Sequence, residues 1–122
     1  MTTLITGGTV VSATGRATAD VLVEGEKIAA LLAPGAAETL GIQAETIDAT
    51  GKYVIPGGVD AHTHMEMPFG GTFASDTFET GTRAAAWGGT TTIIDFVVQY
   101  PDQRIMDQYH AWHEKAGGNC AI

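Results

Sequence analysis

The stretch that decides the fold is residues 51–64, with the sequence GKYVIPGGVDAHTH. Its Pro-Gly-Gly run at residues 56–58 combines strong turn formers, so we predict a domain boundary between residues 1–55 and residues 56–122. Before the boundary, short apolar runs are separated by glycine-containing turns, which is typical of β-strands. The clearest example is a predicted hairpin around Gly25. We therefore predict that the first segment is rich in β-structure.

After the boundary, apolar runs alternate with helical patterns. The predicted order is strand, helix, strand, helix and the beginning of another strand, over residues 59–65, 75–87, 90–98, 101–116 and 119–122. Ser75 or Asp76 is the predicted cap of the first helix. This alternation predicts a parallel sheet, either doubly wound or closed as a (β/α)8 barrel. A complete barrel needs about 250 residues, and about 65 of the 122 residues follow the boundary. We therefore expect an α/β fold whose barrel is incomplete within this chain.

The composition argues against several functional classes. The formal net charge is −8, which disfavours binding to nucleic acid or to an anionic membrane. Cys120 is the single cysteine, so no intramolecular disulfide can form, and this fits a reducing compartment. The chain begins without the basic and apolar regions of a signal peptide, and no apolar run approaches the roughly 18 residues that suggest a membrane helix. We predict a cytoplasmic protein.

Two histidines separated by one residue, His62 and His64, are the strongest candidate metal ligands. Alternate side chains of a strand share a face, so the imidazoles of such a pair can converge on one cation. Asp60 lies one step earlier on that face, where it could orient a histidine from behind. A chance pair is the alternative for an isolated motif, but this pair ends a predicted strand and precedes a glycine-rich loop. In parallel α/β folds, sites form at the carboxyl ends of strands.

Residues 51–64 resemble the entry into the barrel of the amidohydrolase superfamily. The sequence MEMPFGGT at residues 65–72 and the sequence GTRAAAWGGTTTIIDF at residues 81–96 resemble the dihydropyrimidinase and D-hydantoinase branch of that superfamily. The resemblance implies the N-terminal part of a metal-dependent hydrolase with a (β/α)8 TIM barrel, preceded by strands of a small β-sandwich domain. It also implies that the chain is an N-terminal fragment, with the barrel incomplete.

The resemblance further implies a site with two divalent metal ions, usually zinc, at the mouth of the barrel. It assigns His62 and His64 to the more buried ion, whereas the other family ligands, a carboxylated lysine, two histidines and an aspartate, would lie beyond Ile122. A hydroxide shared by the metals would attack a ring carbonyl of a dihydropyrimidine or of a 5-substituted hydantoin. Two histidines alone leave a catalytic zinc under-coordinated. We therefore expect the 122-residue chain by itself to be inactive.

Three alternatives remain open. The substrate could be allantoin or another ureide. The chain could instead belong to a non-catalytic dihydropyrimidinase-like protein that assembles with partners, although such relatives often lose the metal histidines that are present here as His62 and His64. The third alternative is a stand-alone, β-rich metal-binding module. For the leading hypothesis the partner is a small cyclic amide, and the resemblance implies a homotetramer or a homodimer.

The loop after the histidine pair bears on substrate choice. The resemblance implies that the apolar side chains of Met65, Met67, Phe69 and Phe73 form a hydrophobic lid over the exocyclic substituent of a neutral ring. Dihydroorotase-like relatives carry an arginine that grips a substrate carboxylate where this sequence has Glu66, so we expect Glu66 to repel an anion. Packing of the loop onto the barrel is the alternative, but apolar side chains also line most small-molecule sites.

Several other residues are predicted to be structural. Asp95 lies inside an apolar strand, where a charge needs a partner. It could orient a loop at the barrel mouth or belong to a structural ion pair, and we favour the structural ion pair. His110 and His113 are interpreted as a solvated flank of the second predicted helix rather than as a metal site. Cys120 is interpreted as a buried thiol. The buried face of the second helix is predicted to consist of Ile105, Tyr109, Trp112 and Ala116.

Overall fold

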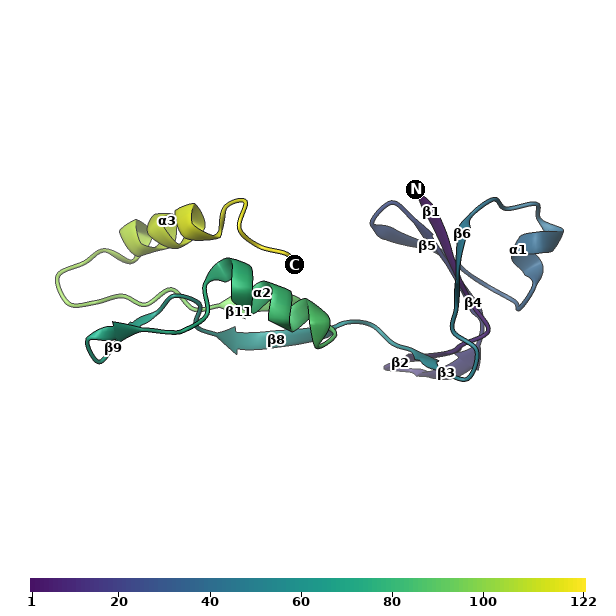
Figure 1. Cartoon of the computed structure of the whole chain (residues 1–122), viewed down its shortest axis with the longest axis horizontal. Coiled ribbons are helices and arrows are strands. Elements are labelled where there is room, and N and C mark those ends of the chain that lie inside the picture. Colours follow the sequence, from purple (N-terminus) through teal and green to yellow (C-terminus); the bar gives the residue numbers. More distant parts are fainter. The chain divides into compact units, whose positions relative to one another are not determined.

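The computed structural model describes all 122 residues, which form two compact units, Met1–Pro56 and Gly57–Ile122 (Figure 1). The division between the units falls at the Pro-Gly-Gly run. None of the helices combines the length and the apolar character that a membrane-spanning helix requires.

The first unit consists of two small sheets and one short helix. Its elements are β1 (Thr2–Thr6), β2 (Thr9–Ser12), β3 (Gly15–Thr18), β4 (Asp20–Glu24), β5 (Lys27–Leu32), α1 (Ala36–Thr39), β6 (Glu45–Asp48) and β7 (Tyr53–Val54). The four-stranded sheet has the order β5-β4-β1-β6, and the three-stranded sheet has the order β3-β2-β7. The predicted hairpin around Gly25 is confirmed, because β4 and β5 pair antiparallel on either side of it.

The four-stranded sheet packs one face against α1. Leu4 of β1 and Leu22 of β4 are paired across the sheet, and both pack with Ala37 of the helix. Partly buried apolar side chains of β5 and of the segment after α1 extend this cluster. Alternate apolar positions on adjacent strands thus supply the core of the first unit.

The buried carboxylate of Asp20 ties two loops of the first unit to β4. Asp20 is 3% exposed, and its two oxygens accept hydrogen bonds from the backbone N–H groups of Gly7 (3.2 Å) and Gly35 (3.0 Å). Gly7 has a φ of +73°, and a Cβ atom there would lie 2.6 Å from Oγ1 of Thr50. Glycine is required at this position because a side chain would be both strained and crowded.

The second unit is built on two parallel strands. Its elements are β8 (Gly58–Thr63), β9 (Pro68–Phe69), β10 (Thr72–Phe73), α2 (Phe78–Trp87), β11 (Thr90–Asp95) and α3 (Ile105–Ala116). Strands β8 and β11 pair in parallel, and β9 and β10 form a small antiparallel hairpin between β8 and α2. Figure 1 shows α2 and α3 on the same side of the β8–β11 pair. The predicted order of strand, helix, strand and helix is therefore confirmed.

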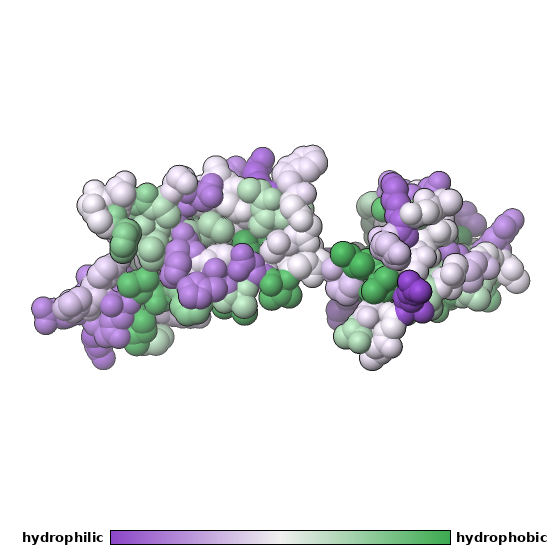
Figure 2. Space-filling model, turned by 90° about the horizontal axis from the view of Figure 1, so that it is seen from below, coloured by the Kyte–Doolittle hydropathy of each residue, from purple (hydrophilic) through white to green (hydrophobic).

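The core of the second unit lies between this strand pair and the helices. Met65, Phe78 and Trp112 are buried there in one cluster. On the strands, apolar side chains such as Val59 and Ile94 are 63% and 53% exposed. Apolar side chains reach the surface in both units, as the green areas of Figure 2 show. The strand pair is therefore packed by helices but retains exposed apolar side chains.

Helix α2 begins later than the sequence suggests. The prediction placed its cap at Ser75 or Asp76, whereas Thr77 is the N-cap and Phe78 is the first helical residue. The side chain of Thr77 accepts a hydrogen bond from the N–H group of Thr80, and the side chain of Thr80 accepts one from the N–H group of Thr77. This reciprocal capping box fixes the start of the helix. Its end at Trp87 is as predicted.

Helix α3 is shorter and less buried than predicted. It begins at Ile105 rather than at residue 101, since Asp102 has a φ of +65°, which is incompatible with a right-handed helix. Of the predicted buried face, Trp112 is 6% exposed, but Ile105 and Tyr109 are 45% and 42% exposed. Only the C-terminal part of that face packs against the core.

The predicted strand over residues 119–122 is absent. The N–H group of Ala121 donates to Oγ1 of Thr82 (3.0 Å), so the backbone here bonds to a helix side chain rather than to a strand. Cys120 is exposed, which contradicts its interpretation as a buried thiol. Without a strand to carry it into the sheet, this cysteine remains at the surface.

Candidate functional site

The two candidate metal ligands lie at the carboxyl end of β8, beside the carboxyl end of β11. His62 is the next-to-last residue of β8, and His64 follows the strand directly. Their Nε2 atoms are 3.1 Å apart, and their ring centroids are 5.1 Å apart with the planes at 72°. The two imidazoles therefore converge on one point, as the alternation along a strand predicts.

This separation suits two ligands of a single cation. Two nitrogens that bind zinc at about 2.0–2.1 Å with tetrahedral geometry are about 3.3 Å apart. Nδ1 of His64 is buried and has no hydrogen-bond partner, which leaves Nε2 of that ring as its outward-facing donor atom. The chain holds no group of three or more His, Cys, Asp or Glu side chains that could bind a metal. The pair thus fits a metal ion but supplies only part of the coordination that a catalytic zinc needs.

Asp60 makes no hydrogen bond to either imidazole. Its Oδ1 atom accepts a hydrogen bond from the backbone N–H group of His62 (3.1 Å). Short acidic side chains commonly bond to the backbone two residues ahead, and this local bond competes with a longer reach toward a ring. In this structure Asp60 holds the backbone of His62, and its role in orienting a histidine ring stays a prediction.

Phe96, directly after β11, contacts both imidazoles, and the sequence did not single it out for this role. The ring of Phe96 stacks on the imidazole of His62, with centroids 4.3 Å apart and planes at 26°, and lies 5.7 Å from the ring of His64. Oδ2 of Asp95 accepts a hydrogen bond from the N–H group of Met65 (2.8 Å), whereas Oδ1 is buried without a partner. Asp95 therefore holds the backbone of the loop that follows β8, which is the alternative to the favoured ion-pair role, and it belongs to no ion pair of the structure.

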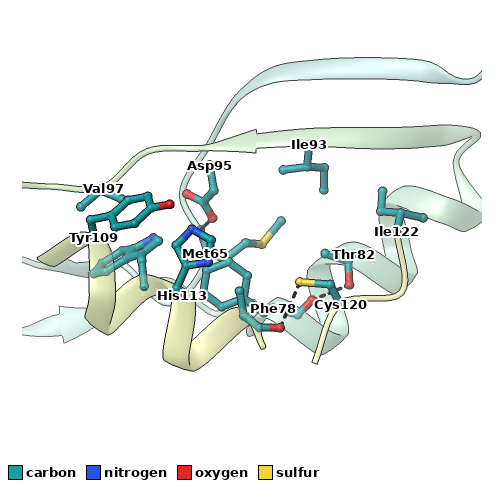
Figure 3. Close-up of a pocket in the computed structure, with 12 residues that line it drawn as sticks. Met65, Phe78, Thr82, Ile93, Asp95, Val97, Tyr109, His113, Cys120 and Ile122 are labelled. Atoms are coloured by element: carbon teal, nitrogen blue, oxygen red, sulfur yellow. Dashed lines mark hydrogen bonds between the residues drawn. The ribbon is translucent and has the colours of Figure 1, made fainter. Parts of the chain in front are cut away.

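The four predicted lid residues occupy two different environments. Met65 is 8% exposed and packs with Phe78 and Trp112, and it lines a cavity of about 300 Å³ between the strands and the helices (Figure 3). It belongs to the core rather than to a lid, because the residue next to His64 falls on the opposite side of the chain from the histidine pair, where the helices pack. Phe69 and Phe73, on the β9–β10 hairpin, are 75% and 66% exposed. Met67, just before this hairpin, is half-buried.

Glu66 is directed away from the histidine pair. One carboxylate oxygen accepts a hydrogen bond from the N–H group of Phe78 (3.3 Å), the first residue of α2, and the other lies 3.8 Å from Nζ of Lys115. A carboxylate is favourable at a helix N-terminus, where N–H groups have no partner within the helix. The expectation that Glu66 repels an anionic substrate is therefore not supported by its placement.

The other two histidines form no comparable arrangement. His110 and His113 are exposed on α3, where their rings lie 5.6 Å and 4.4 Å from the ring of Tyr109. Neither belongs to a group that could hold a metal. Their exposure agrees with the predicted solvated flank.

Comparison with known proteins places this arrangement in a family. The model of the amidohydrolase family matches residues 53–117, which include the histidine pair and the two parallel strands β8 and β11. The chain belongs to the amidohydrolase family. Members of the amidohydrolase family are generally metal-dependent, which agrees with the convergence of the two imidazoles.

Two relatives within the amidohydrolase family show the branch. The chain is 61% identical to the D-hydantoinase of Streptomyces coelicolor over 121 residues, which are 98% of this chain and 26% of the relative. It is 42% identical to the dihydropyrimidinase of Rattus norvegicus over 116 residues, which are 93% of this chain and 22% of the relative. The chain spans about a quarter of the length of these relatives. The predicted resemblance to the dihydropyrimidinase and D-hydantoinase branch is confirmed.

A solved structure supports the fold of this amidohydrolase. The dihydropyrimidinase from Brevibacillus agri superposes with a TM-score of 0.92 at 49% identity, over 100% of this chain and 26% of that structure. The predicted fold class is confirmed: the chain has the α/β fold of the N-terminal part of an amidohydrolase TIM barrel, without a closed barrel.

Proposed function

We propose that this chain contributes the first two metal ligands and the first barrel strands to a cyclic amidohydrolase. The proposed reaction is the hydrolytic opening of the ring of a dihydropyrimidine or of a 5-substituted hydantoin. The observation that carries the proposal is the 3.1 Å separation between the Nε2 atoms of His62 and His64 at the carboxyl end of β8. The names of the relatives, D-hydantoinase and dihydropyrimidinase, support the substrate class.

In the proposed site, the Nε2 atoms of His62 and His64 hold one divalent cation, with zinc as the proposed metal. A second divalent ion would be bound by ligands outside this chain. When bound, such ions activate a water molecule and polarise a carbonyl group of the ring. The contribution of this chain is to hold two ligands in a fixed relation, and Phe96 covers one face of the His62 ring.

The exposed hairpin after the pair is the proposed cover for the ring substituent. Phe69 and Phe73 present large apolar surfaces to solvent, as expected of residues that meet an apolar group of a ligand. The hydroxyl group of Tyr100 donates to the carbonyl oxygen of Pro68 (3.1 Å) and so ties the base of the hairpin to the segment after β11. We propose that Met67, Phe69 and Phe73 together favour a neutral ring with an apolar substituent.

The proposed assembly and compartment follow the family. We propose a homodimer or homotetramer in the cytoplasm, with a small cyclic amide as the bound partner. Cys120 supports a reducing compartment, since it is the single cysteine and its thiol is free and exposed.

A hybrid enzyme tests the proposal, with this chain replacing the matching quarter of the Streptomyces coelicolor D-hydantoinase. We expect zinc-dependent opening of dihydrouracil or of a 5-substituted hydantoin by the hybrid, and no turnover by the 122-residue chain alone. His62→Ala and His64→Ala should each lower kcat/KM of the hybrid more than about a hundredfold, since loss of outer partners alone costs about 10–100-fold. Metal content per protomer should fall in parallel.

His113→Ala is the matched control, because it removes an exposed imidazole from the same unit. It should leave kcat/KM and metal content unchanged. The rest of the hybrid comes from a D-hydantoinase and supplies the remaining parts of the site. If the hybrid folds but neither binds metal nor opens the ring, the proposal that this chain is part of such an enzyme is wrong. Opening of allantoin in preference to both other rings would move the proposal to a ureide hydrolase.

A further inference from the structure

The histidine pair is held by β11 as well as by its own strand. The N–H group of Phe96 donates to the carbonyl oxygen of Thr63 (3.1 Å), and the carboxylate of Asp95 accepts from the N–H group of Met65 (2.8 Å). These two bonds bracket His64 on both sides. The backbone that carries His64 is therefore fixed by two consecutive residues of the neighbouring segment, although His64 itself lies just outside the strand.

The ring of Phe96 acts on the side chains rather than on the backbone. It lies nearly parallel to the imidazole of His62, at 4.3 Å and 26°, and is tilted by 50° to that of His64 at 5.7 Å. A free imidazole rotates about two side-chain bonds, and ordering it costs conformational entropy. Stacking against Phe96 limits the rotation of the His62 imidazole. The orientation that it favours places Nε2 of His62 3.1 Å from Nε2 of His64.

Phe96 packs with the candidate ligands rather than with the core of the second unit. Its side chain is 43% exposed, and it is not part of the buried cluster of the second unit. Its recorded aromatic contacts are both with the candidate metal ligands. A phenylalanine that contributes mainly to the core would be buried among apolar side chains, as Phe78 is at 5% exposed.

We propose that Phe96 is a positioning residue that holds the imidazoles of His62 and His64 in a metal-binding arrangement, with Asp95 fixing the backbone behind them. This inference rests on the proposed metal site but assigns a residue that binds no metal. Such preorganisation strengthens ligand binding because the ordering cost is met before the ion arrives. The proposal predicts an effect of the aromatic ring that a residue of similar size without a ring does not reproduce.

The test compares Phe96→Leu with Phe96→Tyr in the 122-residue chain. Phe96→Leu should weaken Co²⁺ and Zn²⁺ binding about tenfold, at the lower end of the range for residues that support metal ligands. In metal-free protein it should also remove the upfield ring-current displacement of the His62 ring protons in an NMR spectrum. Phe96→Tyr keeps the ring and should restore both properties. Trp87→Leu, which removes an aromatic ring that is 93% exposed, is the matched control and should change neither.

The outcomes separate this inference from the metal site itself. If Phe96→Leu binds metal as the wild type does, while His62→Ala does not, Phe96 has no positioning role and the metal site stands. If neither the 122-residue chain nor the hybrid enzyme, which supplies the remaining ligands, binds metal through His62 and His64, the metal site fails and the inference falls with it. If a variant chain does not fold, the same substitutions are measured in the hybrid enzyme by metal affinity and by the cobalt absorption spectrum, with the same criteria.

Discussion

The two units use an aspartate in the same way but complete its hydrogen bonds differently. In the first unit, both oxygens of Asp20 accept from backbone N–H groups, those of Gly7 and Gly35. In the second unit, one oxygen of Asp95 accepts from Met65 and the other is buried without a partner. Buried polar groups are nearly always satisfied, so an unsatisfied oxygen calls for an explanation, whereas a satisfied one is explained by the fold.

The difference follows from what each aspartate supports. Asp20 joins two loops within a sheet of four strands and is sealed from solvent. Asp95 ends a strand whose sheet has only one partner strand, and its carboxylate lines the cavity between strands and helices (Figure 3). Asp20 serves the stability of the first unit, and Asp95 serves the position of the segment that carries the candidate ligands. Substitutions of the two residues should therefore have different consequences.

Asp20→Asn should give the largest loss of stability. The amide keeps one acceptor but places an NH2 group against a backbone N–H group, so a hydrogen bond to a charged acceptor is lost and a buried donor is left without a partner. We expect the free energy of unfolding of the first unit to fall by about 2–3 kcal/mol. Amide hydrogen exchange in β1 and β4 measures this, because both tryptophans lie in the second unit. Glu45→Gln, on the exposed strand β6, is the control and should change exchange little.

Asp95→Asn should have a much smaller effect on stability. The amide oxygen can still accept from Met65, and the NH2 group takes the place of an oxygen that has no partner. We expect a change in unfolding free energy within about 1 kcal/mol, because no hydrogen bond is lost. Urea unfolding followed by the fluorescence of the buried Trp112 reports on this unit. A loss as large as that of Asp20→Asn would mean that the comparison between the two aspartates does not hold.

The parts of the fold that obey a simple period were predictable from the sequence. The strand–helix alternation followed from apolar spacing, and the convergence of His62 and His64 followed from the alternation of side chains along a strand. The predicted hairpin around Gly25 was also found. These features depend on neighbours in the sequence, so one sequence suffices to identify them.

The parts that depend on the end of an element were not predictable. Strand β8 ends at Thr63, and Glu66 then adopts a φ of +52° and reaches the first residue of α2 instead of the site. The start of α2 was decided among three adjacent polar residues by the hydrogen bonds of Thr77. The contact of Phe96 with the histidines depends on the register between two strands that are about 30 residues apart, and no local pattern encodes that register.

A third carboxylate, Asp48, should show the smallest effect. It also accepts a hydrogen bond from a backbone N–H group, that of Thr50, but it is exposed to solvent. Hydrogen bonds from the side chain and then the backbone of Thr50 hold the pKa of Asp48 below its ordinary value, and the charge of Lys52 adds to them. Because the folded pKa is the lower one, the stabilisation is complete above the ordinary value of 3.8 and is lost as pH falls through the folded pKa. An NMR titration of the Asp48 carboxyl carbon measures the shift. Thr50→Val should raise the pKa more than Lys52→Met does, and the reverse order would show that charge, rather than hydrogen bonding, dominates at an exposed aspartate.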